Sequence, residues 1–200
     1  MALNFANNNS LSAITTKPSG LSGGTMNLIS TQTASNSSTI SFTSGIDDSY
    51  DKYVFKFYDI HPSASGTYLY FNGTDDDSSH SFDVTQTTTF FRAYNFENDA
   101  ARTLEYVASM DVAQSTNARL ASGLHNDNDS SLSGYLHLFN PSSTTFVKNF
   151  MSDTNYEQGA VSINSRCAGY FNTTEDITGV EFKMSSGNID SGVIKLYGIS

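Results

Sequence analysis

The side chains with the greatest capacity for chemistry in this chain are carboxylates, since it contains 20 Asp and Glu residues. Glycoside hydrolysis requires two carboxyl groups that face each other across the scissile bond. No spacing singles out such a pair, and on so acidic a chain close acids arise by chance. We therefore expect a protein that is not an enzyme. The acids with the most suitable positions are Glu97, Asp99, Glu105, Glu157, Glu175, Asp176 and Glu181.

Nucleophilic catalysis has equally little support in the sequence. No Gly-x-Ser-x-Gly segment is present, although a Ser-His-Asp triad is defined in space and stays open as an alternative. The only cysteine, Cys167, lies among strand-like residues and is expected to be a small buried side chain. One cysteine and dispersed histidines also provide no tetrahedral zinc site. The four histidines fall in predicted turns or strands, at positions 61, 80, 125 and 137.

Two acidic loops, residues 75–77 and 126–129, have the oxygen-rich composition that suits calcium. An EF-hand loop needs glycine at its sixth position, which is His80 in the first loop and Leu132 in the second. We therefore expect solvated turns and no cofactor, with calcium binding as the minority alternative.

The charge balance excludes several classes of partner. The net charge is −10, and the ten Lys and Arg residues are scattered along the chain. Nucleic-acid binding requires clustered basic side chains, and anionic lipid surfaces attract the same clusters. No apolar run approaches the roughly 20 residues of a membrane span, and the N-terminal residues do not resemble a signal peptide. We expect neither a nucleic-acid partner nor membrane insertion.

The segment 38–62 has the clearest pattern of secondary structure. Ile40 and Phe42 alternate with polar residues, which is typical of a half-buried strand. After a turn rich in Gly, Asp and Ser, Tyr53, Phe55 and Phe57 share one face of a second strand. Because its other face is also bulky, we expect this strand to be central in its sheet, with the three aromatic rings in the core.

Further strands follow at the spacing of 8–12 residues that is typical of sandwiches and barrels. The interval 95–102 differs, because its apolar residues fall at near-helical spacing, and we expect a short helix or irregular crossover there. The predicted fold is an all-β, antiparallel β-sandwich that is jelly-roll-like. The expected strands are 67–71, which ends at an Asn72-Gly73 turn, then 82–91, 132–139, 144–151, 161–171, 180–184 and 193–199.

Residues 1–38 are predicted to form an extended N-terminal arm, and residues 39–200 the sandwich domain. The arm is rich in Asn and Gly but more apolar than a linker requires, so we expect it to dock on a neighbouring protein, with residues 25–32 joining a sheet. Aromatic area on two strands exceeds what a solvent-facing surface needs. The expected contacts with partners or identical subunits are Leu3, Phe5, Leu11, Ile14, Val54, Tyr58, Tyr68 and Tyr70.

Several passages resemble the small virion structural proteins of tailed bacteriophages from marine hosts, notably cyanobacterial phages. These passages are MALNFANNNSLSAIT, ISFTSGIDDSYDKYVFKFYDIHP, GYLHLFNPSSTTFVKNF and FKMSSGNIDSGVIKLYGIS. The resemblance implies a tail-fibre, tail-associated or capsid-decorating component, made in the host cytoplasm, released in the virion by lysis and commonly trimeric.

The resulting expectation is a tail-associated structural protein that forms a homotrimer and contacts other virion proteins through its arm. A host surface glycan or protein is a further candidate partner. Capsid decoration, a carbohydrate-binding β-sandwich module and, more weakly, a small glycan-degrading enzyme are the alternatives.

Overall fold

The computed structural model describes residues 26–199, and their regular structure is almost entirely antiparallel β-sheet, which confirms the all-β prediction. The one helical segment in this range is the short 3-10 helix η1 (Ala108–Met110), and no helix there could span a membrane. The strands are β1 (Met26–Ser37), β2 (Ile40–Phe42), β3 (Lys52–Pro62), β4 (Thr67–Thr74), β5 (Gln86–Phe96), β6 (Arg102–Tyr106), β7 (Ala118–Leu124), β8 (Leu132–Phe139), β9 (Lys148–Glu157), β10 (Val161–Phe171), β11 (Gly179–Met184) and β12 (Ile189–Ile199).

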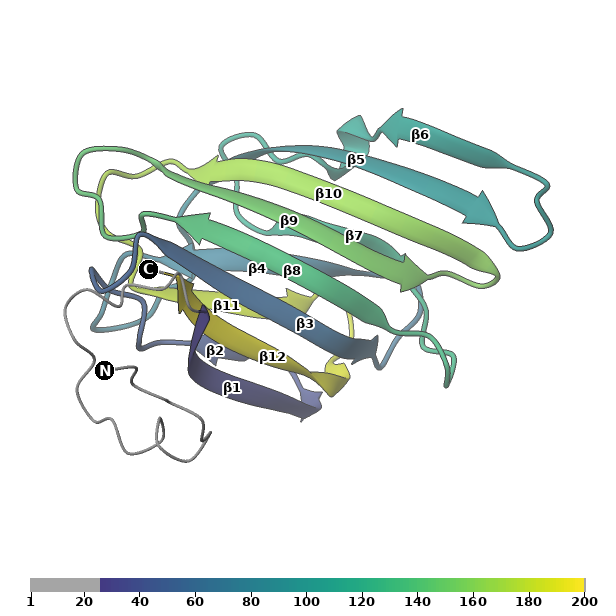
Figure 1. The fold of residues 1–200 in the computed structure, drawn as a ribbon, viewed down its shortest axis with the longest axis horizontal. Helices are drawn as coiled ribbons and strands as arrows, with labels where there is room; N and C mark the ends of the chain where they lie inside the picture. Colours follow the sequence, from purple (N-terminus) through teal and green to yellow (C-terminus); the bar gives the residue numbers. More distant parts are fainter. Residues whose placement is uncertain (1–25, 200) are drawn as a thin grey trace, which may run out of the picture.

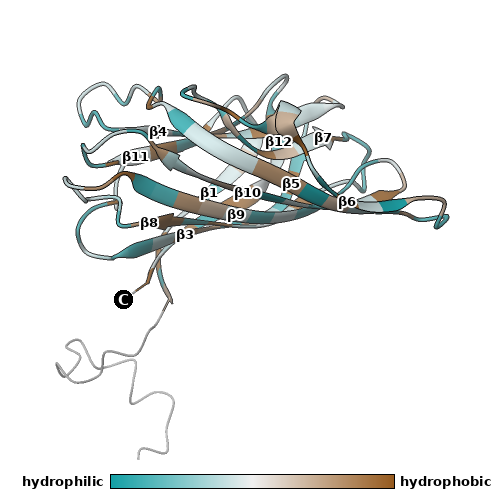
Figure 2. Cartoon of the chain, turned by 90° about the horizontal axis from the view of Figure 1, so that it is seen from above, coloured by the Kyte–Doolittle hydropathy of each residue, from teal (hydrophilic) through white to brown (hydrophobic). Residues whose placement is uncertain are grey.

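The strands form two packed layers, as Figures 1 and 2 show from two directions. The large sheet has eight strands in the order β1-β12-β3-β8-β9-β10-β5-β6, and the small sheet has four in the order β2-β11-β4-β7. Every pairing between neighbouring strands is antiparallel. The predicted antiparallel sandwich is therefore the observed architecture.

The large sheet owes its extra width to two hairpins. Its first four strands, β1-β12-β3-β8, match the four strands of the small sheet in number, and both groups interleave early and late segments of the chain. This interleaving is consistent with a jelly-roll-like connection. The β9–β10 and β5–β6 hairpins then continue the large sheet past β8, so that β5 and β6 project beyond the small sheet (Figure 1).

Aromatic rings fill the space between the sheets. Tyr53, Phe55 and Phe57 of β3 are at most 1% exposed, and β3 lies between β12 and β8, which confirms the predicted central strand and its core face. From the small sheet, Phe182 packs against the β3 rings, with 5.4 Å between its ring centroid and that of Phe55. Because rings from both layers meet there, the aromatic residues couple the two sheets.

Two local predictions were wrong. Asn72-Gly73 lies inside β4 and makes no turn, because the buried Asn72 carboxamide accepts a hydrogen bond from the Asn117 backbone N–H at 2.6 Å. A Cβ on Gly73 would lie 2.7 Å from the Phe171 ring, so glycine is needed there for packing. Residues 95–102, expected to form a short helix or irregular crossover, instead end β5, make the turn of the β5–β6 hairpin and begin β6.

The predicted arm needs a correction at its C-terminal end. Residues 26–37 form β1, which pairs with β12 along its length as the edge strand of the large sheet. This pairing agrees with the expectation that residues 25–32 join a sheet. The predicted boundary between arm and domain, after residue 38, is too late in the chain, because β1 already belongs to the sheet. Residues 1–25 lie outside the described part of the chain, and with them the expected contacts Leu3, Phe5, Leu11 and Ile14.

Candidate functional site

A pocket lies where the small sheet ends and the inner side of the projecting strands is uncovered. Its volume is about 310 Å³, at the lower end of the range of about 300–1,000 Å³ typical of small-molecule sites. Strands β5 and β10, the end of β7 and the β9–β10 turn supply its lining. The pocket is thus a direct result of joining an eight-stranded sheet to a four-stranded one.

The floor of the pocket is apolar and aromatic. Along β5, Arg92, Tyr94 and Phe96 alternate with outward residues and continue the face of the buried Phe90. The rings of Tyr94 and Phe96 meet edge to face, with centroids 5.9 Å apart. Val161 and Ile163 of β10 complete the floor. This surface offers both ring faces and ring edges to a bound molecule.

Two side chains from turns close the other side of the pocket, and glycines make room for both. The Gln158 carboxamide lies so close to Gly123 that a Cβ on this glycine would clash with the carboxamide nitrogen. The His125 ring lies against Gly159, where a Cβ would be 3.0 Å from its Cε1. Both glycines have positive φ, which suits glycine. The two glycines therefore leave open the space that these polar side chains occupy.

The charges of the pocket are compensated within the chain. Arg92 donates through Nε to Glu105 of β6 at 2.8 Å, and its guanidinium lies 5.5 Å from the Tyr94 ring centroid. His125 Nδ1 is 3.4 Å from a carboxylate oxygen of Asp127. Because the Glu105 bond uses Nε, the two terminal nitrogens of Arg92 can still donate to a ligand. The site is polar but carries no excess charge.

The seven acids considered for catalysis are spread over three strands and two loops. Glu105 binds Arg92, and Glu181 pairs with Lys183 at 3.0 Å. Glu157 accepts hydrogen bonds from the Ser130 hydroxyl and from the Ala160 backbone N–H. The others lie in loops: Glu97 and Asp99 in the β5–β6 turn, and Glu175 and Asp176 between β10 and β11. Asp99 also pairs with Arg102, so four of these seven carboxylates have structural partners.

Cys167 has the buried position predicted for it. Its side chain is 1% exposed on the inner face of β10, and burial raises the pKa of the thiol to about 12. A thiol that stays protonated at neutral pH is a poor nucleophile. The histidines lie on different elements, His61 in β3, His80 between β4 and β5, His125 after β7 and His137 in β8, and His125 is the one that lines the pocket.

The acidic loop at residues 75–77 is organised by its own hydrogen bonds. One carboxylate oxygen of Asp76 accepts from the Ser78 hydroxyl at 2.6 Å and from the Ser78 backbone N–H at 2.8 Å, and its other oxygen accepts from the Ser79 hydroxyl. These bonds hold the pKa of Asp76 well below its usual value. Within residues 26–199, no group of three or more His, Cys, Asp or Glu side chains is arranged to hold a metal ion.

Acidification is expected to weaken the fold through Asp76. Its hydrogen bonds favour the ionised form in the folded state, so they contribute stability above the unfolded pKa of about 4, and this contribution disappears as the pH falls through the folded pKa. Thermal unfolding between about pH 5 and about pH 2 should therefore show a smaller loss of stability for Asp76→Asn than for the unmodified protein. Equal losses of stability in the two proteins would show that the Asp76 hydrogen bonds do not contribute to the acid sensitivity of the fold.

A second surface of interest is the outer face of the large sheet, which we define as the side turned away from the small sheet. It carries eight of the eleven large apolar side chains that are exposed in residues 26–199. They come from six strands, with exposed fractions from 38% to 74%. These residues are Met26, Leu28, Tyr58, Phe91, Leu104, Tyr106, Tyr135 and Met151.

The strand register makes part of the outer face contiguous. Tyr135 is opposite Asp153, Asp153 opposite Arg166, Arg166 opposite Phe91, and Phe91 opposite Tyr106, so these five side chains form one row across five strands. Met151 lies beside this row and lines, with Tyr135 and Phe91, a depression of about 290 Å³. Arg166 and Asp153 pair at 3.0 Å within it.

The contact residues expected on strands fall on opposite sides of the molecule. Val54 and Tyr58 belong to the outer face of the large sheet, where Val54 is 2% and Tyr58 40% exposed. Tyr68 and Tyr70 lie on the outward side of the small sheet, with ring centroids 6.3 Å apart. The structure therefore does not bring the four together into one patch.

Comparison of the chain with protein-family models, with curated proteins and with solved structures finds no match.

Proposed function

We propose that this protein is a non-enzymatic structural protein of a tailed-phage virion, tail-associated and assembled as an oligomer of identical chains. The virion setting, with synthesis in the host cytoplasm and release by lysis, is supported by the four passages that resemble such proteins. The single observation that supports assembly is the outer face of the large sheet, with its eight exposed apolar side chains.

The extent of the outer face supports a docking role. Single exposed apolar side chains are normal on any protein, whereas contiguous apolar patches usually mark contacts. Here the row from Tyr135 to Tyr106 and the adjoining Met151 run from the middle of the sheet to its edge strand β6. Aromatic residues, Met and Arg are also the types enriched at interface cores. We therefore take this face as the surface through which copies associate.

The distribution of charge favours a second copy of this chain as the occupant. Each copy carries a net charge of −10, so association is least opposed where the fewest acids meet. Five basic side chains accompany the apolar groups of the outer face: Lys52, Lys56, Arg102, Arg166 and Lys195. The acid in the same rows, Asp153, is neutralised by Arg166. Two lysines are further sheltered over tyrosine rings, Lys56 at 5.5 Å from Tyr197 and Lys195 at 5.4 Å from Tyr58.

Light scattering of the purified chain tests the proposal. A homotrimer, the form that the resemblance implies, should have about three times the 21.7 kDa mass of the chain. It should persist at high salt, because salt screens interactions between charges and the proposed contact is mainly apolar. The double variant Met151→Ser with Tyr106→Ser should shift the mass towards the monomer. Both side chains are more than half exposed, at 56% and 58%, so their loss should leave the fold intact.

Phe146→Ser is the matched control, because Phe146 is 69% exposed but lies in the loop between β8 and β9, outside the strands whose side chains form the outer face. It should assemble as the unmodified protein does. An unmodified chain that is monomeric at all concentrations would overturn the proposal, as would a double variant with unchanged mass.

A further inference from the structure

We infer that the pocket under the β5–β6 hairpin, lined by Arg92, Tyr94, Phe96, His125 and Gln158, is a binding site for an uncharged sugar residue of a glycan. The inference goes beyond the proposed assembly, because this pocket lies on the inner side of the large sheet and none of its lining residues belongs to the outer face. Phe96 is 36% exposed, but it points inward.

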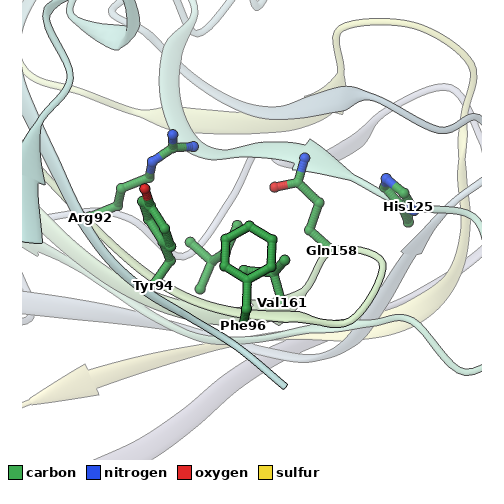
Figure 3. A pocket seen from close by; sticks show the side chains of 7 residues that line it. Arg92, Tyr94, Phe96, His125, Gln158 and Val161 are labelled. Atoms are coloured by element: carbon green, nitrogen blue, oxygen red, sulfur yellow. The ribbon is translucent and has the colours of Figure 1, made fainter. Parts of the chain in front are cut away.

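The arrangement of polar and apolar groups matches the two sides of a sugar ring. Figure 3 shows the polar ends of Arg92, Tyr94 and Gln158 directed to the same side, with the ring of Phe96 and the methyl groups of Val161 between and below them. A pyranose has an apolar face of C–H groups and hydroxyls around its edge. Its face can lie on one of the two aromatic rings, which are inclined to each other by 76°, while its hydroxyls meet the polar ends.

The donors and acceptors suit hydroxyl groups, which both donate and accept. Arg92 donates only, whereas the Gln158 carboxamide and the Tyr94 hydroxyl can each donate and accept. A neutral His125 has one donor and one acceptor nitrogen. A pocket that contains both hydrogen-bond donors and acceptors favours a ligand that also has both. Any polar group that is buried without a partner, whether it belongs to the protein or to the ligand, costs free energy.

The electrostatics favour an uncharged ligand over an acidic one. Arg92 is already paired with Glu105 at 2.8 Å, and His125 lies near Asp127. An anionic sugar would find no free positive charge at the site and would approach a chain of net charge −10. The volume of about 310 Å³ suits a small ligand portion, so we assign one or two sugar residues of a longer glycan to it.

The site is preorganised, which reduces the free energy lost in ordering it on binding. Gly123 and Gly159 leave the space in which the Gln158 and His125 side chains lie. The Arg92–Glu105 bond holds β6 against β5 at the side of the pocket. Binding therefore requires little rearrangement of the hairpin.

The test is binding of the full chain to a printed array of oligosaccharides. The array carries neutral hexoses, N-acetylhexosamines and deoxyhexoses beside sialylated and uronic-acid-containing glycans. We expect retention of at least one neutral class, and titration of that oligosaccharide should show at least a tenfold loss of affinity for Phe96→Ala. Gln158→Ala should show the same loss of affinity, and it provides the test if Phe96→Ala proves to be destabilised.

Phe146→Ala is the matched control, a truncation of another exposed phenylalanine that lies outside the pocket, and its affinity should be unchanged. The inference would be overturned by an absence of binding to neutral glycans, by a preference for acidic ones, or by neutral binding that neither pocket variant reduces. None of these results bears on the mass of the assembly, so the two proposals fail separately.

Discussion

Replacing Phe182 with Ala should lower the free energy of unfolding by about 3–5 kcal/mol, the usual effect of truncating a buried phenylalanine. Phe182 is fully buried, and its ring meets four others from both layers. The centroid distances are 6.4 Å to Phe42, 5.4 Å to Phe55, 5.3 Å to Phe57 and 5.5 Å to Phe71. An alanine would leave a cavity at the point where the sheets are joined, and the surrounding rings are held by their own strands.

Chemical denaturation followed by circular dichroism measures this effect. Phe146→Ala provides the comparison, because Phe146 is 69% exposed and surface substitutions usually change stability by less than about 0.5 kcal/mol. If the two variants unfolded at the same denaturant concentration, Phe182 would not be a central contact of the core.

Gly192→Ala is expected to be comparably damaging, for a reason that concerns the backbone. Gly192 has a φ of +121°, a conformation that L-residues rarely adopt, and it lies at the irregular pairing between β12 and β3. A Cβ there would be 2.7 Å from the Asp59 carbonyl oxygen and 2.8 Å from Ile60 Cα. Conformational strain and overpacking together predict a loss of about 2–5 kcal/mol.

Gly66→Ala separates the two contributions to that loss. Gly66 also has a positive φ, of +74°, but no neighbouring atom lies within 4 Å of the position that a Cβ would occupy. It should show the conformational effect alone, about 1–2 kcal/mol. Equal losses in the two variants, measured by denaturation, would show that the contact with β3 contributes nothing.

The faces of the strands can be predicted from the sequence, because alternation reports which side of a sheet is buried. Alternation places Tyr53, Phe55 and Phe57 in the core, where the structure has them, and the predicted strand 161–171 has the bounds of β10. Alternation does not report which strands are neighbours. The order of the sheets, with β12 between β1 and β3, depends on contacts between distant segments.

Local signals fail where a long-range contact outweighs them. Asn72-Gly73 has the composition of a turn, but Asn117 and the Phe171 ring hold it within β4. The strand β7 is absent from the predicted set, because its sequence ARLASGL is poor in the β-branched and aromatic residues that mark strands. The turn of the β5–β6 hairpin has a helix-like pattern, because apolar residues on either side of it fall at helical spacing by coincidence.

The candidate pocket is only partly visible in the sequence. The alternation of Phe90, Arg92, Tyr94 and Phe96 along β5 is a signal for one shared face that could have been found. His125 and Gln158 come from two separate turns and reach the pocket only through the packing of the layers. Their part in the site could not be deduced without the structure.

The position of β12 has a consequence for the order of events during synthesis. Because β12 separates β1 from β3, β1 has no partner and β3 lacks one of its two neighbours until residues 189–199 have left the ribosome. Sheets built from such distant pairings form slowly. A nascent chain that lacks β12 therefore presents two unpaired strand edges, and unpaired edges are prone to associate with other chains. Ribosomal pauses before residues 189–199 are translated would lengthen this vulnerable interval.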